Sequence, residues 1–155
     1  MKDILNDLSR TWQNAMYLFW KEFHLMALVI DLKPNEKVII GSAVITNDKQ
    51  RTRLSIDGDA PILREKDVMQ IDGADSPCKR IYYIIQGMYL SNADKATDMY
   101  EDYFEQMKAV QEAAPSTQEH FQGINAAILS GHYYKALKAA KDLIAYEEEL
   151  LQNVG

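Results

Sequence analysis

Three arginines in the first half of the chain have the type and spacing needed to bind a polyanion. Arg51 and Arg53 are two positions apart in a segment with β-strand alternation, so they share one face, opposite the apolar one. Arg64 ends a short apolar segment further along. A guanidinium group is permanently charged and offers a fork of donors that fits phosphates and base edges. These residues predict a basic strand face; the alternative is a set of ordinary solvated charges.

The charge of the chain is unevenly distributed. Residues 26–80 carry nine Lys and Arg against nine Asp and Glu, whereas residues 81–155 carry five against eleven. The net charge of −6 therefore belongs to the second half, while four of the five arginines fall in the neutral part. A polyanionic partner would meet residues 26–80 and be repelled by the rest of the chain.

No pattern typical of an enzyme or a metal site occurs in the sequence. His24, His120 and His132 do not have the spacing of metal ligands, and there is no glycine-rich phosphate loop or nucleophile motif. The single Cys78 cannot form an internal disulfide and is interpreted as reduced and structural. We therefore expect a protein that is not an enzyme and needs no cofactor.

Length and hydropathy predict one globular domain in the cytoplasm. The 155 residues are 47 % hydrophobic, which is enough for a sizeable core. No apolar run approaches the length of a membrane span, and the N-terminus lacks the features of a secretory signal. We expect no membrane partner.

An amphipathic extension is predicted for residues 1–25. Its apolar residues recur at helical spacing, namely Ile4, Leu8, Trp12, Met16, Phe19 and Phe23. This stripe can pack on the rest of the domain, bind a partner or lie on a membrane, and its few cations rank the membrane last. A fourth interpretation is that these residues are coding sequence upstream of a start at Met26.

Residues 26–75 have the pattern of an antiparallel β region. The expected strands are Leu28–Leu32, Lys37–Thr46, Arg51–Ile56 and Ile62–Arg64. The short polar turns between them predict a meander. Since Lys37–Thr46 is apolar on both faces, it is expected to be a central strand covered on both sides.

About four helices are expected in residues 76–155, which makes the fold class α+β: a small N-terminal antiparallel sheet followed by helices. They should run from residue 76 to about 90, 93 to 113, 116 to 130 and 132 to about 151. The boundary signals are the N-cap Ser76 with Pro77, the helix breaker Pro115, the capping-box pair Ser116 and Glu119, and the C-terminal Gly131. The run Glu147–Glu149 is interpreted as a solvated helix end.

Four separated stretches, in the right order, resemble the FlbT family of flagellar regulators. They are Leu32 to Asn47, Ala60 to Asp67, Ser76 to Tyr89 and Gly131 to Leu137. The resemblance covers residues 26–151, with residues 1–25 outside the family pattern. It implies a cytoplasmic bacterial protein that controls flagellin synthesis after transcription, through the 5′ untranslated region of flagellin mRNA. Some members of the family repress and others activate.

A second likeness concerns the strands. Gly58-Asp-Ala-Pro61 and the pair Arg64-Glu65 are similar to the carbon-storage-regulator family of RNA-binding proteins, which holds RNA between its first strand and an arginine-bearing last strand. At matching positions this implies an RNA contact at Arg64 with Lys33 as its neighbour; convergent turn chemistry explains the pattern equally well. The candidate RNA-binding residues are Lys33, Arg51, Arg53, Arg64 and Lys66.

Two functional hypotheses follow, neither of them enzymatic. In the first, the arginine face binds the leader of flagellin mRNA and alters its translation or decay. In the second, the acidic helical half acts as an adaptor or chaperone of flagellar assembly and binds flagellin or another flagellar regulatory protein. The oligomeric state stays open, including a homo-oligomer joined through sheet edges.

Overall fold

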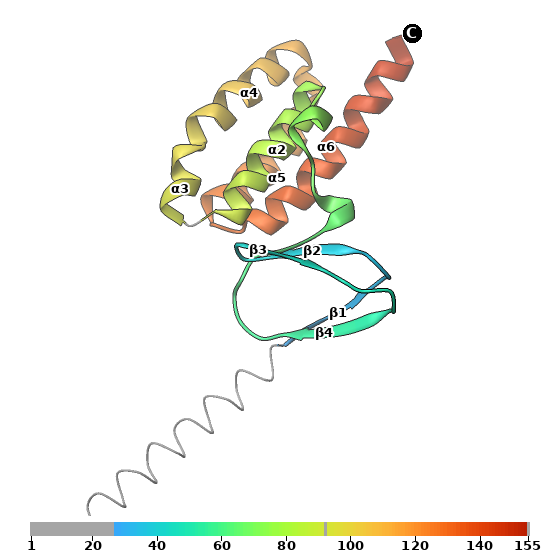
Figure 1. Ribbon diagram of the computed structural model, residues 1–155. Helices are drawn as coiled ribbons and strands as arrows, with labels where there is room; N and C mark the ends of the chain where they lie inside the picture. Colours follow the sequence, from blue (N-terminus) through green and yellow to red (C-terminus); the bar gives the residue numbers. More distant parts are fainter. Residues whose placement is uncertain (1–26, 92, 155) are drawn as a thin grey trace, which may run out of the picture. The chain divides into compact units, whose positions relative to one another are not determined.

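The computed structural model describes residues 27–91 and 93–154 of the chain. The predicted amphipathic extension therefore lies outside the described residues. The chain divides between Glu65 and Lys66 into two compact units, here called the strand unit and the helical unit. The observed architecture is α+β, with antiparallel strands in the first unit and helices in the second (Figure 1).

The strand unit contains two small antiparallel sheets. Its strands are β1 (Leu28–Leu32), β2 (Lys37–Ile40), β3 (Ala43–Thr46), β4 (Thr52–Ile56) and β5 (Ile62–Arg64). One sheet pairs β1 with β4, and the other has the order β3-β2-β5. The expected meander is wrong, because only β2 and β3 are neighbours both in sequence and in space. Pairing instead places apolar residues together, as in the cross-strand pair Ile30 and Leu54.

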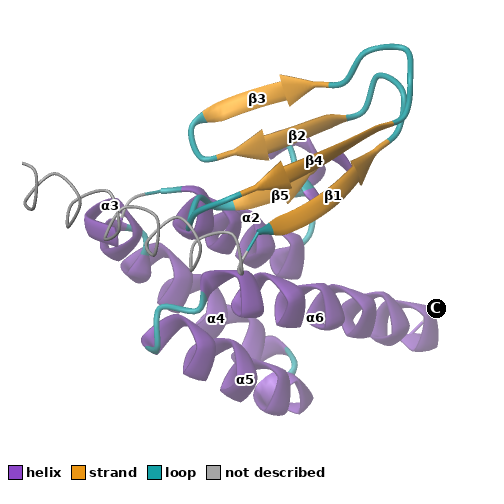
Figure 2. Ribbon diagram, turned by 90° about the horizontal axis from the view of Figure 1, so that it is seen from below, coloured by secondary structure: helices purple, strands orange, loops and turns teal. Residues whose placement is uncertain are grey.

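The segment Lys37–Thr46 is a hairpin and not the single central strand expected from its apolar pattern. The chain turns at Gly41, whose φ of 60° lies in the left-handed region that a residue without Cβ adopts at low cost. As a result β2 and β3 run in opposite directions side by side, as Figure 2 shows. Residues 43–46 are all exposed, so β3 is an edge strand.

A compact apolar cluster lies inside the strand unit. Ile30, Leu32 and Val38 form its buried centre. Partly buried side chains from β2, β4 and β5 surround them, namely Ile40, Leu54, Ile56 and Ile62. The expected alternation of β4 is confirmed, because Leu54 and Ile56 pack on this cluster while Arg53 and Ser55 are exposed.

The helical unit begins with short 3₁₀ turns and continues with five α-helices among the described residues. The 3₁₀ turns are η1 (Glu65–Asp67), which spans the boundary, η2 (Ile71–Gly73) and η3 (Pro115–Thr117). The helices are α2 (Pro77–Leu90), α3 (Ala93–Asp98), α4 (Tyr100–Ala113), α5 (Gln118–Leu129) and α6 (Tyr133–Val154). Helix α2 packs against both α4 and α6, and α5 packs against α6 (Figure 1).

The helix expected over residues 93–113 is broken in two at Met99. Gly87 of α2 lies at the same level, and a Cβ added there would be 2.9 Å from the Met99 sulfur. A side chain at position 87 would therefore meet the flexible end of the Met99 side chain, which would have to shift. This interhelical contact lies at the break between α3 and α4.

The turn between α5 and α6 is confirmed in detail. Gly131 has a φ of 72°, and its N–H donates to the carbonyl of Ile128 while the N–H of His132 donates to that of Ala127. These two bonds form a Schellman motif. The expected capping box is wrong, because residues 115–117 form η3 and the Thr117 hydroxyl donates to the Ala114 carbonyl instead.

Glu147 of α6 completes the start of α2. The Ser76 side chain accepts a hydrogen bond from the N–H of Lys79, which confirms it as the N-cap. The Glu147 carboxylate in turn accepts bonds from the Ser76 hydroxyl and from the N–H of Cys78. A carboxylate is favourable at the positive end of a helix dipole, so Glu147 is not the solvated residue expected from its acidic run.

Candidate nucleic-acid interface

Arg53 and Asp31 form the exposed part of the candidate interface. They lie directly opposite each other on β4 and β1, and the Arg53 Nε is 3.0 Å from the Asp31 carboxylate. Their side chains are 72 % and 54 % exposed, respectively. An ion pair so open to water contributes little to stability, so the guanidinium group can exchange this carboxylate for a phosphate.

Glu36 organises the second part of the interface. Its carboxylate accepts hydrogen bonds from Nε and Nη2 of Arg64 at 2.7 to 3.0 Å, and from the N–H of Lys33 at 2.8 Å. Nη2 of Arg64 also donates to the Asp31 carbonyl at 2.8 Å. These bonds, first that of the Lys33 N–H and then those of Arg64, lower the pKa of Glu36 below its usual value of 4.5.

The structure thus places Lys33 and Arg64 near each other, in the same neighbourhood as Arg53. The Arg64 side chain is only 32 % exposed, and its Nε and Nη2 are bonded within the unit. These bonds hold the Arg64 guanidinium group against the end of β1. The exposed Lys33 and Arg53 are better placed to meet a ligand from solvent.

Two loops beside this cluster are joined by Asn47, a residue that the sequence pattern indicates only as part of a turn. Asn47 is 9 % exposed. Its side-chain nitrogen lies 2.8 Å from the carbonyls of Lys33 and Gln50, and 3.3 Å from that of Leu32. The N–H of Asn35 also donates to the Asp48 carbonyl at 3.0 Å. The loops that carry the cations are consequently fixed to each other.

The remaining candidates are exposed. Arg51 immediately precedes β4. Lys49, two residues earlier, is also exposed and was not among the cations predicted from the sequence. The position of Lys49 in a polar turn next to Arg51 was the sequence feature that could have indicated it. Lys66 is exposed in η1 and belongs to the helical unit, so it is assigned separately from the strand-unit cluster.

The two units differ sharply in charge. Residues 27–65 carry six Lys and Arg against six Asp and Glu, whereas residues 66–155 carry eight against fourteen. An approaching polyanion is therefore repelled by the helical unit and not by the strand unit. Within the strand unit, internal pairing partly neutralises Arg53 and Arg64.

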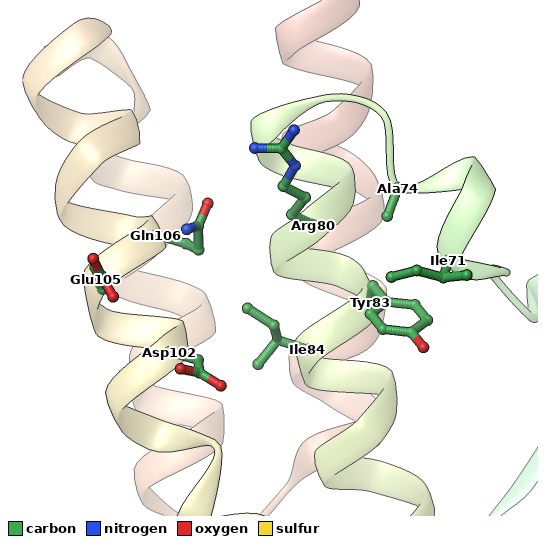
Figure 3. Close-up of a pocket in the computed structure, with 8 residues that line it drawn as sticks. All are labelled: Ile71, Ala74, Arg80, Tyr83, Ile84, Asp102, Glu105 and Gln106. Carbon is green, nitrogen blue, oxygen red and sulfur yellow. The ribbon is translucent and has the colours of Figure 1, made fainter.

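The helical unit contains a groove of different character between α2 and α4. Two adjoining cavities of about 280 and 430 Å³ share Tyr83, Ile84 and Asp102 as lining residues. Figure 3 shows Ile84 of α2 directed toward the α4 residues Asp102 and Gln106, with Arg80 one turn earlier in α2. The groove combines the apolar side chains of Ile71 and Ile84 with charges of both signs, those of Arg80, Asp102 and Glu105.

Several tyrosines of the helical unit have structural roles. Tyr82 donates to the Asp67 carbonyl at 2.7 Å, and burial raises its pKa to about 12. Tyr103 is fully buried and donates to the Asn125 side chain at 2.7 Å, with its pKa raised by burial. These two phenols are not available for base stacking. Burial, followed by the nearby Glu147, raises the pKa of the Cys78 thiol to about 12, so the thiol is unreactive.

Among the described residues, none of the helices combines the length and apolar character required to cross a bilayer. Across residues 27–91 and 93–154, no group of three or more His, Cys, Asp or Glu side chains is arranged to hold a metal ion.

Comparison with known proteins gives consistent matches over most of the chain. The family model described as "Flagellar protein FlbT" matches residues 28–151. A Rhodopseudomonas palustris (strain TIE-1) protein named "Probable flagellum biosynthesis repressor protein FlbT" is 49 % identical over 127 residues, covering 81 % of this chain and 98 % of that protein.

More distant relatives have similar names. The "Probable flagellum biosynthesis repressor protein FlbT 1" of Bradyrhizobium diazoefficiens is 46 % identical, covering 81 % of this chain and 85 % of the relative. The "Flagellum biosynthesis repressor protein FlbT" of Caulobacter vibrioides (strain ATCC 19089) is 34 % identical, covering 84 % and 93 %. No solved structure matches the chain. The family match and the relatives together establish that the chain belongs to the FlbT family.

Proposed function

We propose that this protein is a non-enzymatic regulator of flagellar synthesis that acts in the cytoplasm on flagellin mRNA. Its relatives are named flagellum biosynthesis repressors, which supports a regulatory role. In this proposal the strand unit binds the 5′ leader of the transcript and changes its translation or decay. Phosphate neutralisation supplies affinity, while contacts with base edges supply sequence choice.

The exposure of Arg53 is the observation that carries the proposal. It lies on a unit without net charge, and its carboxylate partner is itself exposed. We assign RNA contacts to Lys33, Arg51 and Arg53, and a positioning role to Arg64. Lys66 is proposed as a further contact from the start of the helical unit.

Binding of the full-length protein to a labelled flagellin leader tests this proposal, with a scrambled leader for comparison. Arg51→Ala and Arg53→Ala should weaken binding and lower the salt slope by about 0.7 for each phosphate that is no longer neutralised. Arg80→Ala is the matched control, because it removes an exposed arginine from the helical unit. An Arg51→Ala, Arg53→Ala double variant that folds and binds the leader as tightly as the parent protein would refute the proposed interface.

The groove between α2 and α4 favours a second candidate function, that of an adaptor or chaperone for flagellin or another flagellar regulatory protein. Its acidic side chains Asp102 and Glu105 lie beside an apolar floor. Reversing both charges to Lys should abolish regulation while leaving RNA binding intact if this function is correct. Asp142→Lys, on the exposed surface of α6, provides the control.

A further inference from the structure

The β3 strand lacks the charged residues that protect other strand edges. The other edge strands, β1, β4 and β5, each contain a charged residue, namely Asp31, Arg53 and Arg64, respectively. Residues 43–46 of β3 have the sequence Ala-Val-Ile-Thr, without a charge or a proline. β3 also ends its sheet, with a neighbour on one side only (Figure 2). Natural proteins commonly use charges or prolines to block such edges.

The backbone of β3 presents hydrogen-bonding groups at this edge. In an antiparallel ladder, successive residues point their N–H and C=O groups alternately to the two sides. The N–H of Asn47 donates inward to the Glu36 carbonyl at 2.9 Å, which places the inward groups at odd-numbered positions. Val44 and Thr46 therefore direct their backbone groups outward.

The side chains of the edge are equally suited to pairing. Val44 is 65 % exposed and continues a row of apolar residues across the sheet, with Ile39 beside it and the buried Leu63 beyond. Ile45, on the opposite face, is 38 % exposed. A strand added at this edge would cover both apolar side chains.

We propose that β3 pairs antiparallel with β3 of a second copy of the chain, with Val44 opposite Val44 of the partner. Two such strands are related by a two-fold axis perpendicular to the sheet, which keeps the same face of both sheets on one side. The two Val44 residues then exchange both backbone hydrogen bonds, and the apolar row continues into the second copy.

Self-complementarity is the reason for choosing a second copy as the occupant. In this register Ala43 lies opposite Ile45 of the partner, and Ser42 opposite Thr46, so no charged residues face each other. Like charges directly opposite would destabilise the pair. The same two-fold pairing at β1, centred on Asp31, would place two carboxylates together. The paired sheets would contain six strands.

Sedimentation equilibrium of the full-length protein over a range of concentrations tests the proposal. A reversible dimer is expected, and Val44→Lys should raise its dissociation constant by about tenfold or more, because two lysines would then lie opposite each other. Val29→Lys is the matched control, since Val29 is also an edge-strand valine and is 53 % exposed. A protein that is monomeric throughout, or variants with equal effects, would overturn the proposal.

Cross-linking provides a second measurement, which detects the dimer even when the substitution weakens it. Opposed residues in a hydrogen-bonded antiparallel pair have Cα atoms about 5.5 Å apart, which is wide for a direct disulfide but brings two thiols within reach of a short bis-maleimide cross-linker. Val44→Cys should therefore form a covalent dimer with this cross-linker, whereas Val29→Cys should not. The native Cys78 is buried and gives little background. Failure of Val44→Cys to cross-link in a folded protein would contradict the proposed register.

Discussion

The strand unit and the helical unit are stabilised by different interactions. Large side chains such as Tyr103, Phe121 and Met88 are fully buried in the helical unit. The buried apolar residues of the strand unit are Ile30, Leu32, Val38 and Leu63, while its loops are held by Asn47, Glu36 and other polar groups. The comparison indicates that apolar burial supports the helical unit, whereas the strand unit depends more on hydrogen bonds.

The strand unit and the helical unit also differ in net charge and in the groups they expose. The helical unit carries the whole excess of negative charge, yet its interior is apolar. The strand unit has no net charge but exposes cations on fixed loops and an uncharged strand edge. The proposed pairing edge and all the proposed RNA contacts except Lys66 therefore lie on the strand unit, which has the smaller apolar centre.

The largest effect is expected from Phe121→Ala in the helical unit. Because Phe121 is fully buried, removal of its ring should lower the free energy of unfolding by about 3–5 kcal/mol. Phe104→Ala is the control, since Phe104 is 38 % exposed and should cost much less. Thermal unfolding monitored by the helical circular dichroism signal measures both. Equal losses would show that burial does not set the stability of this unit.

Asn47→Ala should have the next largest effect, in the strand unit. The substitution leaves the carbonyls of Lys33 and Gln50 without their side-chain donor, which should cost about 1–3 kcal/mol. In the Asn47→Ala variant, the amides of the strand unit should exchange faster than in the parent protein, whereas the amides of the helices should change less. Gln50→Ala, at an exposed position, is the control and should leave exchange unchanged. Unaltered exchange in Asn47→Ala would contradict the claim that the strand unit depends on hydrogen bonds of its polar side chains.

The smallest expected effect is an acid-dependent loss in the strand unit. Since the Lys33 N–H and Arg64 lower the pKa of Glu36, its contribution to stability is fully present above the unfolded value, near 4.5. It is lost as the pH falls through the folded pKa. Glu36→Gln should therefore lower stability at pH 7 and flatten the acid limb of the stability curve.

Denaturant unfolding at a series of pH values measures this effect, with Asp59→Asn as the control for removing an exposed carboxylate of the strand unit. Glu36→Gln and Asp59→Asn curves of the same shape would argue against a special role for Glu36. Arg64→Ala should flatten the acid limb less than Glu36→Gln, because it removes the Arg64 bonds to Glu36 but leaves the bond from the Lys33 N–H.

Features with local causes were predictable from the sequence. Ser76 with Pro77 and the Gly131 turn were identified correctly, because caps depend on residues within a few positions. The exposed face of β4 followed from its alternation. The change from strand to helical periodicity likewise placed the strands before the helices.

Features that depend on distant contacts were missed. The bonds between Arg64 and Glu36 join residues 28 positions apart, so the sequence pattern offered Arg64 as a surface cation. The break at Met99 coincides with an approach to Gly87 of another helix. The Gly41 hairpin was missed for a different reason, because its apolar flanks have the pattern of one continuous strand.

The cap that Glu147 supplies to α2 has a consequence for the order of synthesis. Ser76 and Glu147 are 71 residues apart, so the start of α2 leaves the ribosome well before the residue that completes it. At typical translation rates of about 5–20 residues per second, the N-terminus of α2 waits several seconds for this partner. The strand unit precedes that interval and contains none of the partners involved. A nascent chain can therefore acquire its strands while α2 is still incomplete.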